Sequence, residues 1–119
     1  MVAMVAAGCS GGGGKAPDTQ RAALMTAVRA YSDAYLGDRP TQAHDLLSSR
    51  CAERISLDQM TALTKGAQAL YGAAKMTSLD VVTIAGSLAR VTYAYDNPAI
   101  NQTAQPWVSE GGAWHYDGC

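Results

Sequence analysis

The spacing of apolar residues changes at residue 75, and this change limits the folds that the chain can adopt. Before residue 75, apolar residues recur every three or four positions, as on one face of a helix. From residue 75 they alternate with polar residues, as in strands that bury one face. Helices followed by strands favour an α+β fold over the alternating order of a parallel α/β sheet. We therefore expect N-terminal helices packed on one face of a curved antiparallel sheet.

Three helices are expected before the sheet. The first covers residues 19–37 and the second about 41–48, with Cys51 just beyond the second. The apolar face of the first is formed by Leu24, Val28, Tyr31 and Tyr35. Because these residues recur at helical spacing, this face is expected to lie against the sheet.

The third helix has the clearest start signal. Ser56 and Gln59 fit a capping box, in which each side chain accepts a hydrogen bond from the other residue's backbone N–H. Gly72 is expected to end the helix. The predicted apolar stripe consists of Leu57, Met60, Leu63, Ala67, Leu70 and Tyr71.

Four strands are expected after the helices, over residues 75–85, 88–95, about 102–109 and 113–117. The connections contain glycine and other turn-forming residues. Short connections between neighbouring strands indicate an antiparallel meander.

The composition indicates one globular domain that does not bind nucleic acid. The chain has 119 residues, of which 48% are hydrophobic and 16% charged, and its net charge is -1. Recognition of phosphate backbones needs clustered Lys and Arg, and the sequence contains no such cluster. We expect no cofactor and no metal site.

The segment Ala6-Ala7-Gly8-Cys9 resembles a bacterial lipobox, in which small residues precede a cysteine that is acylated after cleavage. The Gly-rich residues that follow have the composition of a flexible tether. We therefore divide the chain into residues 1–18, a truncated lipoprotein signal with lipobox and tether, and residues 19–119, the folded domain. Lipidation of Cys9 would anchor the protein to the outer face of the cell membrane.

The residues before Cys9 lack part of the expected signal. A secretory signal has a positively charged start and an apolar stretch of 7–15 residues, whereas no Lys or Arg precedes Cys9. Two interpretations remain: the true start lies upstream, or the lipobox match is a coincidence.

Cys51 and Cys119 lie within the predicted domain, apart from Cys9. The two histidines do not add ligands at a spacing typical of a metal site, so a disulfide is favoured over a metal pair. The alternative is two unpaired buried thiols. A disulfide would indicate an oxidising, extracytoplasmic compartment.

Three segments together resemble small actinobacterial lipoproteins of the nuclear transport factor 2-like superfamily. They are YSDAYLGDRPTQAHDLLSSRC, LARVTYAYDNPAI and QPWVSEGGAWHYDGC. The resemblance covers about residues 19–119. It implies a cystatin-like cone in which three helices and a bent antiparallel sheet enclose a pocket. It also implies that Cys51 pairs with Cys119. The candidate pocket residues are Tyr31, Tyr35, Tyr93, Tyr95, Trp107 and Trp114.

An enzyme with this cone would need an acid–base residue inside the pocket, beside a tyrosine that donates a hydrogen bond. The candidates are Asp33, Asp80, His115, His44 and the phenol of Tyr93. Asp33 lies opposite the apolar helix face, and Asp80 and His115 alternate out of phase with their apolar neighbours. His44 is expected on the surface. These placements favour solvent over the pocket for all four.

The leading hypothesis is a non-enzymatic cell-envelope lipoprotein that binds a small apolar ligand or a partner protein. One alternative is a small isomerase- or cyclase-like enzyme. The other is an accessory subunit of an envelope transport complex. Shared fold does not decide among them, because one fold hosts many functions.

Overall fold

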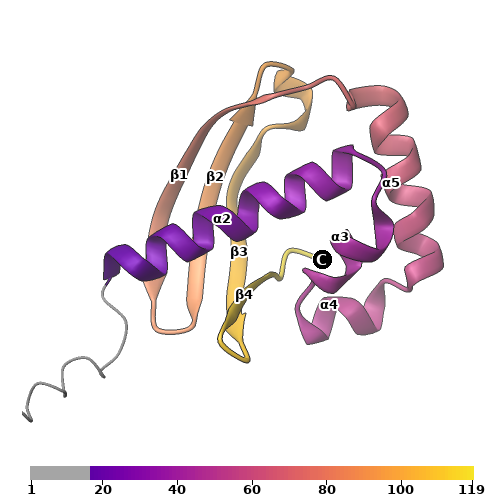
Figure 1. The fold of residues 1–119 in the computed structure, drawn as a ribbon. Helices are drawn as coiled ribbons and strands as arrows, with labels where there is room; N and C mark the ends of the chain where they lie inside the picture. The colour runs from indigo at the N-terminus through magenta and orange to yellow at the C-terminus, as the bar shows by residue number, and fades with distance from the viewer. Residues whose placement is uncertain (1–16) are drawn as a thin grey trace, which may run out of the picture.

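A computed structural model describes residues 17–119, which form an α+β domain with helices packed against a four-stranded antiparallel sheet (Figure 1). Cys9 and the predicted lipobox lie outside these residues. The elements are α2 (Pro17–Leu36), α3 (Pro40–Asp45), α4 (Ser49–Arg54), α5 (Leu57–Tyr71), β1 (Met76–Ala85), β2 (Leu88–Tyr95), the short 3-10 helix η1 (Pro98–Ile100), β3 (Gln102–Glu110) and β4 (Ala113–Tyr116). The predicted α+β class and the four predicted strands of the antiparallel sheet are confirmed.

The sheet is a meander in the order β1-β2-β3-β4. Gly86 begins the turn between β1 and β2 with a φ of 62°, and Gly111 and Gly112 join β3 to β4 with φ values of 59° and 84°. Positive φ at these turn positions favours glycine, which has no Cβ to clash with the backbone. The sequence alone therefore determines where the strands reverse.

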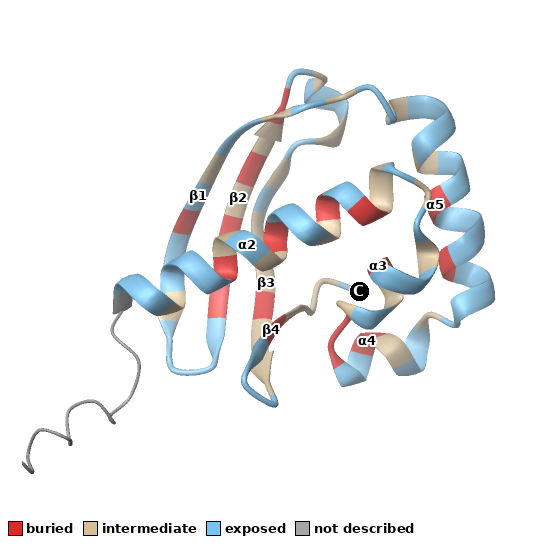
Figure 2. Ribbon diagram, in the orientation of Figure 1, coloured by how far each residue is buried: buried red, intermediate tan, exposed pale blue. Residues whose placement is uncertain are grey.

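Helix α2 crosses the inner face of the sheet and forms the main core with it (Figure 1). Leu24 and Val28 of α2 are fully buried there, together with Val91 of β2. Figure 2 shows buried residues on α2 and on β2, whereas most of α5 is exposed. Burial of this apolar surface is the main force that attaches α2 to the sheet.

A second, smaller core lies among the helices. Each helix or its flank contributes one or two residues to it: Ala34, Ala43, Leu47, Cys51 and Met60. Two aromatic side chains, Tyr31 and Tyr116, pack against both cores. Their rings stack with centroids 4.8 Å apart, so this pair joins the sheet half of the domain to the helical half.

Helix α4 was not predicted from the sequence, and it corrects the expected number of helices from three to four within residues 17–119. It has only six residues, which is too short to show an apolar period. Ser48 caps its first turn by accepting a hydrogen bond from the Cys51 backbone N–H at 3.2 Å. Cys51 therefore lies within a helix, rather than just beyond one.

The predicted apolar stripe of α5 is also corrected. The capping box of Ser56 and Gln59 is present as predicted, but only Met60 and Thr64 of the helix are buried. The expected core residues Leu57, Leu63 and Leu70 are 44%, 44% and 73% exposed. The reason is that α5 packs on α2 and α3 along a narrow line and does not lie on the sheet (Figure 1).

The segment after β4 holds the helical half to the sheet. The backbone N–H of Tyr116 donates to the Leu46 carbonyl at 2.7 Å, and the Ser48 N–H donates to the Tyr116 carbonyl at 2.8 Å. Arg50 forms an ion pair with Asp117 at 3.1 Å. Next to it, Cys51 and Cys119 form a disulfide with Cα atoms 5.6 Å apart. This is the pairing that the sequence favoured.

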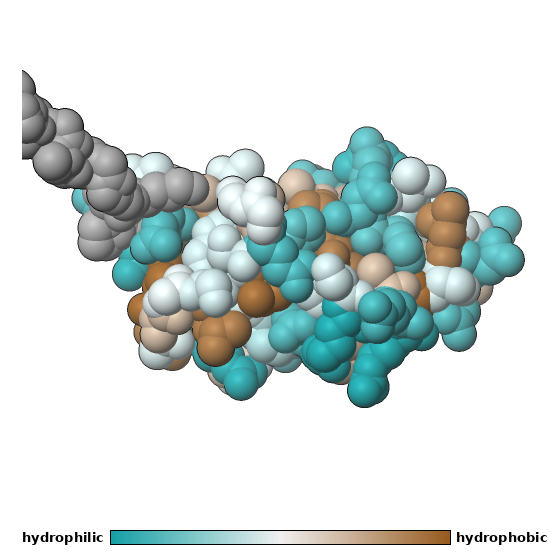
Figure 3. Space-filling model, turned by 90° about the horizontal axis from the view of Figure 1, so that it is seen from below, coloured by the Kyte–Doolittle hydropathy of each residue, from teal (hydrophilic) through white to brown (hydrophobic). Residues whose placement is uncertain are grey.

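The outer surface is mixed in character. Seen from below, hydrophobic side chains form separate patches between hydrophilic ones (Figure 3). Within residues 17–119, no helix combines the length and apolarity that a membrane span requires.

We expect the disulfide to supply a large share of the domain's stability. Reduction, or the double substitution Cys51→Ala and Cys119→Ala, should lower the free energy of unfolding by about 4 kcal/mol, because the bridge joins residues 68 positions apart and restricts the unfolded chain. Urea denaturation with and without reductant measures this change, and Cys9→Ala is the matched control. Detection of two free thiols in the folded, unreduced protein would contradict the bridge.

Candidate functional site

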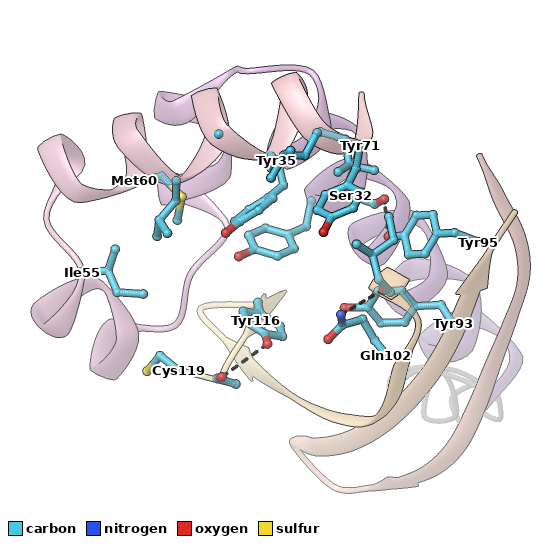
Figure 4. Close-up of a pocket in the computed structure, with 18 of the residues that line it drawn as sticks. Ser32, Tyr35, Ile55, Met60, Tyr71, Tyr93, Tyr95, Gln102, Tyr116 and Cys119 are labelled. Carbon is cyan, nitrogen blue, oxygen red and sulfur yellow. Dashed lines mark hydrogen bonds between the residues drawn. The ribbon is translucent and has the colours of Figure 1, made fainter. Parts of the chain in front are cut away.

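A cavity of about 580 Å³ lies between α5, α2, the ends of β2 and β4, and the segment after β4 (Figure 4). This volume is in the range typical of small-molecule sites. All six tyrosines of the chain line it: Tyr31, Tyr35, Tyr71, Tyr93, Tyr95 and Tyr116. A single cavity therefore collects every phenol that the protein has.

The rest of the lining is mainly apolar. One wall is formed by apolar residues of α5: Met60, Leu63, Ala67 and Leu70. The apolar stripe of this helix therefore faces the cavity and does not pack on the sheet. Among residues 17–119, no Asp, Glu, Lys, Arg or His side chain lines the cavity. The side chains of this lining are consequently uncharged as long as the phenols keep their protons.

Two of the phenols already have strong hydrogen bonds within the protein. The Tyr95 hydroxyl and the Ser32 hydroxyl lie 2.6 Å apart and are buried. The Tyr116 hydroxyl donates to Gln105 Oε1 at 2.8 Å, and a second contact joins it to the Gly118 carbonyl at 3.3 Å. These bonds fix the two rings, because a buried phenol loses stability when its hydroxyl has no partner.

The hydroxyl protons of the other four phenols, those of Tyr31, Tyr35, Tyr71 and Tyr93, have no acceptor among residues 17–119. Burial raises the pKa of Tyr93, and the indole N–H of Trp107, which faces the Tyr93 oxygen, offsets part of this rise. Figure 4 shows Tyr35 entering from α2 and Tyr93 from β2, with their hydroxyls directed into the space between the helices and the sheet. The cavity thus presents hydrogen-bonding groups from the helical side and from the sheet.

Burial raises the pKa of five of these tyrosines: Tyr31, Tyr35, Tyr93, Tyr95 and Tyr116. The largest cause in each case is the loss of water around the phenolate. For Tyr31 and Tyr93, the neighbouring phenol of Tyr116 raises the pKa further. These hydroxyls therefore stay protonated and neutral at physiological pH.

The six aromatic residues that the sequence singled out occupy two different environments. Tyr31, Tyr35, Tyr93 and Tyr95 line the cavity. Trp107 and Trp114 do not line it, and they are buried in the core between α2 and the sheet instead. The physical reason is their position on β3 and β4, where the inner face is covered by α2. Trp107 reaches the cavity only indirectly, through its edge contacts with Tyr31 and Tyr116.

None of the four candidate acid–base residues lines the tyrosine cavity. Asp33 and Asp80 are exposed, as expected from the pattern. His44 is half-buried rather than on the surface, because its Nε2 lies 2.8 Å from the Ile55 carbonyl. His115 pairs with Val108 on the outer face of the sheet, where its Nδ1 is buried without a partner among the described residues.

Asp33 lies instead beside a second, polar hollow of about 530 Å³ between α2 and the start of β1. The basic side chains of Arg29, Arg39 and Lys75 surround it there. The Ser32–Tyr95 pair separates the two sites, since both residues line both hollows.

Several cavity residues were missed by the sequence analysis. Ser32 was not considered because a serine within a helix usually points to solvent or bonds to its own backbone. The wall from α5 was assigned to the core, although the mixture of small and apolar residues at Gly66, Ala67 and Leu70 suits a cavity equally well. Within residues 17–119, no group of three or more His, Cys, Asp or Glu side chains is placed to hold a metal ion.

Comparison with known proteins gives no relative for this chain: neither protein-family models nor curated protein sequences match it. The functional conclusion therefore depends on the cavity itself.

We expect the unfolding free energy to fall steeply as the pH rises above about 10. Burial holds the pKa of Tyr31 and Tyr93 above that of an unfolded tyrosine, which is about 10. Above that pH the unfolded chain loses protons that the folded protein keeps, so each such tyrosine costs up to ~1.4 kcal/mol per pH unit. Below pH 10 this contribution to stability is fully present.

Urea denaturation at pH 9, 10 and 11 measures the decline. The substitutions Tyr31→Phe and Tyr93→Phe should make it shallower, since phenylalanine does not titrate. An identical slope in the wild type and in the double variant would contradict the assignment of the decline to these two phenols.

Proposed function

We propose that this protein is a non-enzymatic binding protein of the cell envelope, and that it holds a small, largely apolar ligand in the tyrosine cavity. The observation that carries the proposal is a cavity of ligand size whose lining contains aromatic and aliphatic side chains but no charged one. Apolar lining with a few polar groups is the usual make-up of a small-molecule site.

Binding without a chemical step fits the site better than catalysis does. An isomerase- or cyclase-like reaction needs a group that accepts and returns a proton next to the substrate. Asp33, Asp80, His44 and His115 all lie away from the cavity, and the phenols that do line it are held in their protonated form. A small ligand is also favoured over a partner protein, because the apolar surface is hollowed between elements.

The envelope location and the finer fold belong to the same proposal. A disulfide between Cys51 and Cys119 suits an oxidising compartment. The lipobox-like segment at Cys9 would supply the membrane anchor. Helices and a curved sheet around a cavity are compatible with the nuclear transport factor 2-like cone that the sequence resembles, and on this basis we propose membership of that superfamily.

Filling the cavity from α5 should abolish ligand binding. Gly66 lines the cavity, and a Cβ added to it would meet no atom within 4 Å. The substitution Gly66→Phe therefore starts its side chain in open space at the wall of the cavity. We expect the affinity for Nile red, an uncharged apolar dye, to fall by about tenfold or more, as loss of ~1.4 kcal/mol of contact would produce. Dye fluorescence titration measures it.

The matched control is Gly66→Ala. It adds up to ~1 kcal/mol of stability through helix propensity but leaves the cavity open, so dye affinity should be unchanged. Equal dye binding by wild type and Gly66→Phe, or no binding by the wild type, would count against a ligand site here.

The anchor is tested separately by labelling cells with a fatty-acid probe. With a complete signal sequence upstream, the wild type should incorporate the probe and Cys9→Ala should not, because the thiol of Cys9 is the predicted acylation site. Equal incorporation by both would remove the lipoprotein part of the proposal.

A further inference from the structure

The hydroxyl groups of the cavity fall into two sets, and this division indicates what kind of ligand fits. Tyr95 and Tyr116 have partners within the protein, in Ser32 and Gln105. The side-chain amide of Gln102 donates to the Ile100 carbonyl at 3.0 Å. The hydroxyl protons of Tyr31, Tyr35, Tyr71 and Tyr93 have no acceptor among residues 17–119, and these four residues line one cavity. Phenols in such sites usually have a hydrogen-bond partner, so a bound molecule can replace the water that would otherwise accept from them.

The charge of the lining limits that molecule. A carboxylate placed here would lose its hydration and find no Lys, Arg or His side chain among the described residues that line the cavity. Anions are therefore disfavoured, while a neutral group that accepts a hydrogen bond is not.

The chemistry of the phenols selects the acceptor. A neutral phenol donates one hydrogen bond, and a carbonyl oxygen can accept two. Tyr35 comes from α2 and Tyr93 from β2, so the cavity offers one donor from the helical side and one from the sheet (Figure 4). The ring pair of Tyr31 and Tyr35, with centroids 5.7 Å apart, offers an aromatic surface for the rest of the molecule.

We propose that the cavity binds a neutral, mainly apolar compound that carries a ketone, quinone or ester carbonyl, and that the phenol proton of Tyr35 or of Tyr93 is donated to this oxygen. This inference rests on the proposed function and narrows its ligand class. Because burial keeps these hydroxyls protonated, they act as donors over the whole physiological pH range.

Three probes of one shape test the proposal by displacement of Nile red from the full chain. They are 2-acetylnaphthalene, which has a carbonyl, 2-isopropenylnaphthalene, in which a CH₂ group replaces the oxygen, and 2-naphthoate, which is an anion. We expect the ketone to bind about three- to tenfold more tightly than the alkene, as one neutral hydrogen bond produces. We expect the carboxylate to bind at least about tenfold more weakly than the ketone, because of its desolvation.

Variants then assign the effect to residues. Tyr35→Phe and Tyr93→Phe together should bring the ratio of ketone to alkene affinity close to one, with little change for the alkene. The control is Thr83→Val, which removes an exposed hydroxyl from β1, outside the cavity. It should leave the ratio unchanged. Thermal melting of each variant verifies that the domain remains folded.

The outcomes separate the two proposals. If Nile red does not bind, the proposed function fails. If Nile red binds but the three probes compete equally, water satisfies the phenols and the carbonyl proposal is overturned while the binding function stands. Tightest binding by 2-naphthoate, or a ratio that survives Tyr35→Phe and Tyr93→Phe, would also overturn it. The probe series needs no variant, so the proposal can be tested even if a substitution prevents folding.

Discussion

The cavity depends on the way in which residues 116–119 are held between the two halves of the domain. Two backbone hydrogen bonds attach Tyr116 to Leu46 and Ser48, and the disulfide from Cys51 to Cys119 closes the same junction. The position of α5 follows from this attachment, because α5 leaves α4 directly and packs on α2 and α3 rather than on the sheet. Without the junction, the helical half would lose its covalent link to the end of the sheet and could shift relative to it. The disulfide between Cys51 and Cys119 and the cavity next to it therefore belong to one structural arrangement.

The aromatic composition fits this arrangement. The chain contains no Phe, and the side chains at the edge of its core are tyrosines. A phenylalanine lining would leave a hollow with no polar group in it, whereas tyrosines pack with their rings and keep a hydroxyl available at the surface of the cavity. Tyr31 shows both roles, since its ring stacks on Tyr116 and contacts Trp107 while it also lines the cavity.

Much of the fold could be predicted from the sequence, and the site could be predicted only in part. The four strands and the capping box at Ser56 are local signals, in which a few neighbouring residues fix the backbone. The disulfide could be inferred by counting cysteines. Helix α4 could not be inferred, because six residues show no period and its cap at Ser48, although local, does not by itself define a helix. The apolar stripe on α5 is visible in the sequence and predicts core residues. Apolar spacing identifies the apolar face of a helix, but it does not show whether this face packs in the core or lines a cavity. The same limit applies to Trp107, which alternates correctly for the inner face yet lies under α2 and not in the cavity.

The narrow packing of α5 gives the cavity walls of unequal stiffness. Only Met60 and Thr64 of this helix are buried, and both lie before Gly66. The following turns, up to Tyr71, form a wall of the cavity with no core behind them, whereas the opposite wall is fixed by the main core and by the Ser32–Tyr95 hydrogen bond. A displacement of the weakly supported wall breaks few contacts and so costs little free energy. The width of the cavity can consequently change at little cost in free energy while the tyrosines of α2 and β2 keep one fixed geometry.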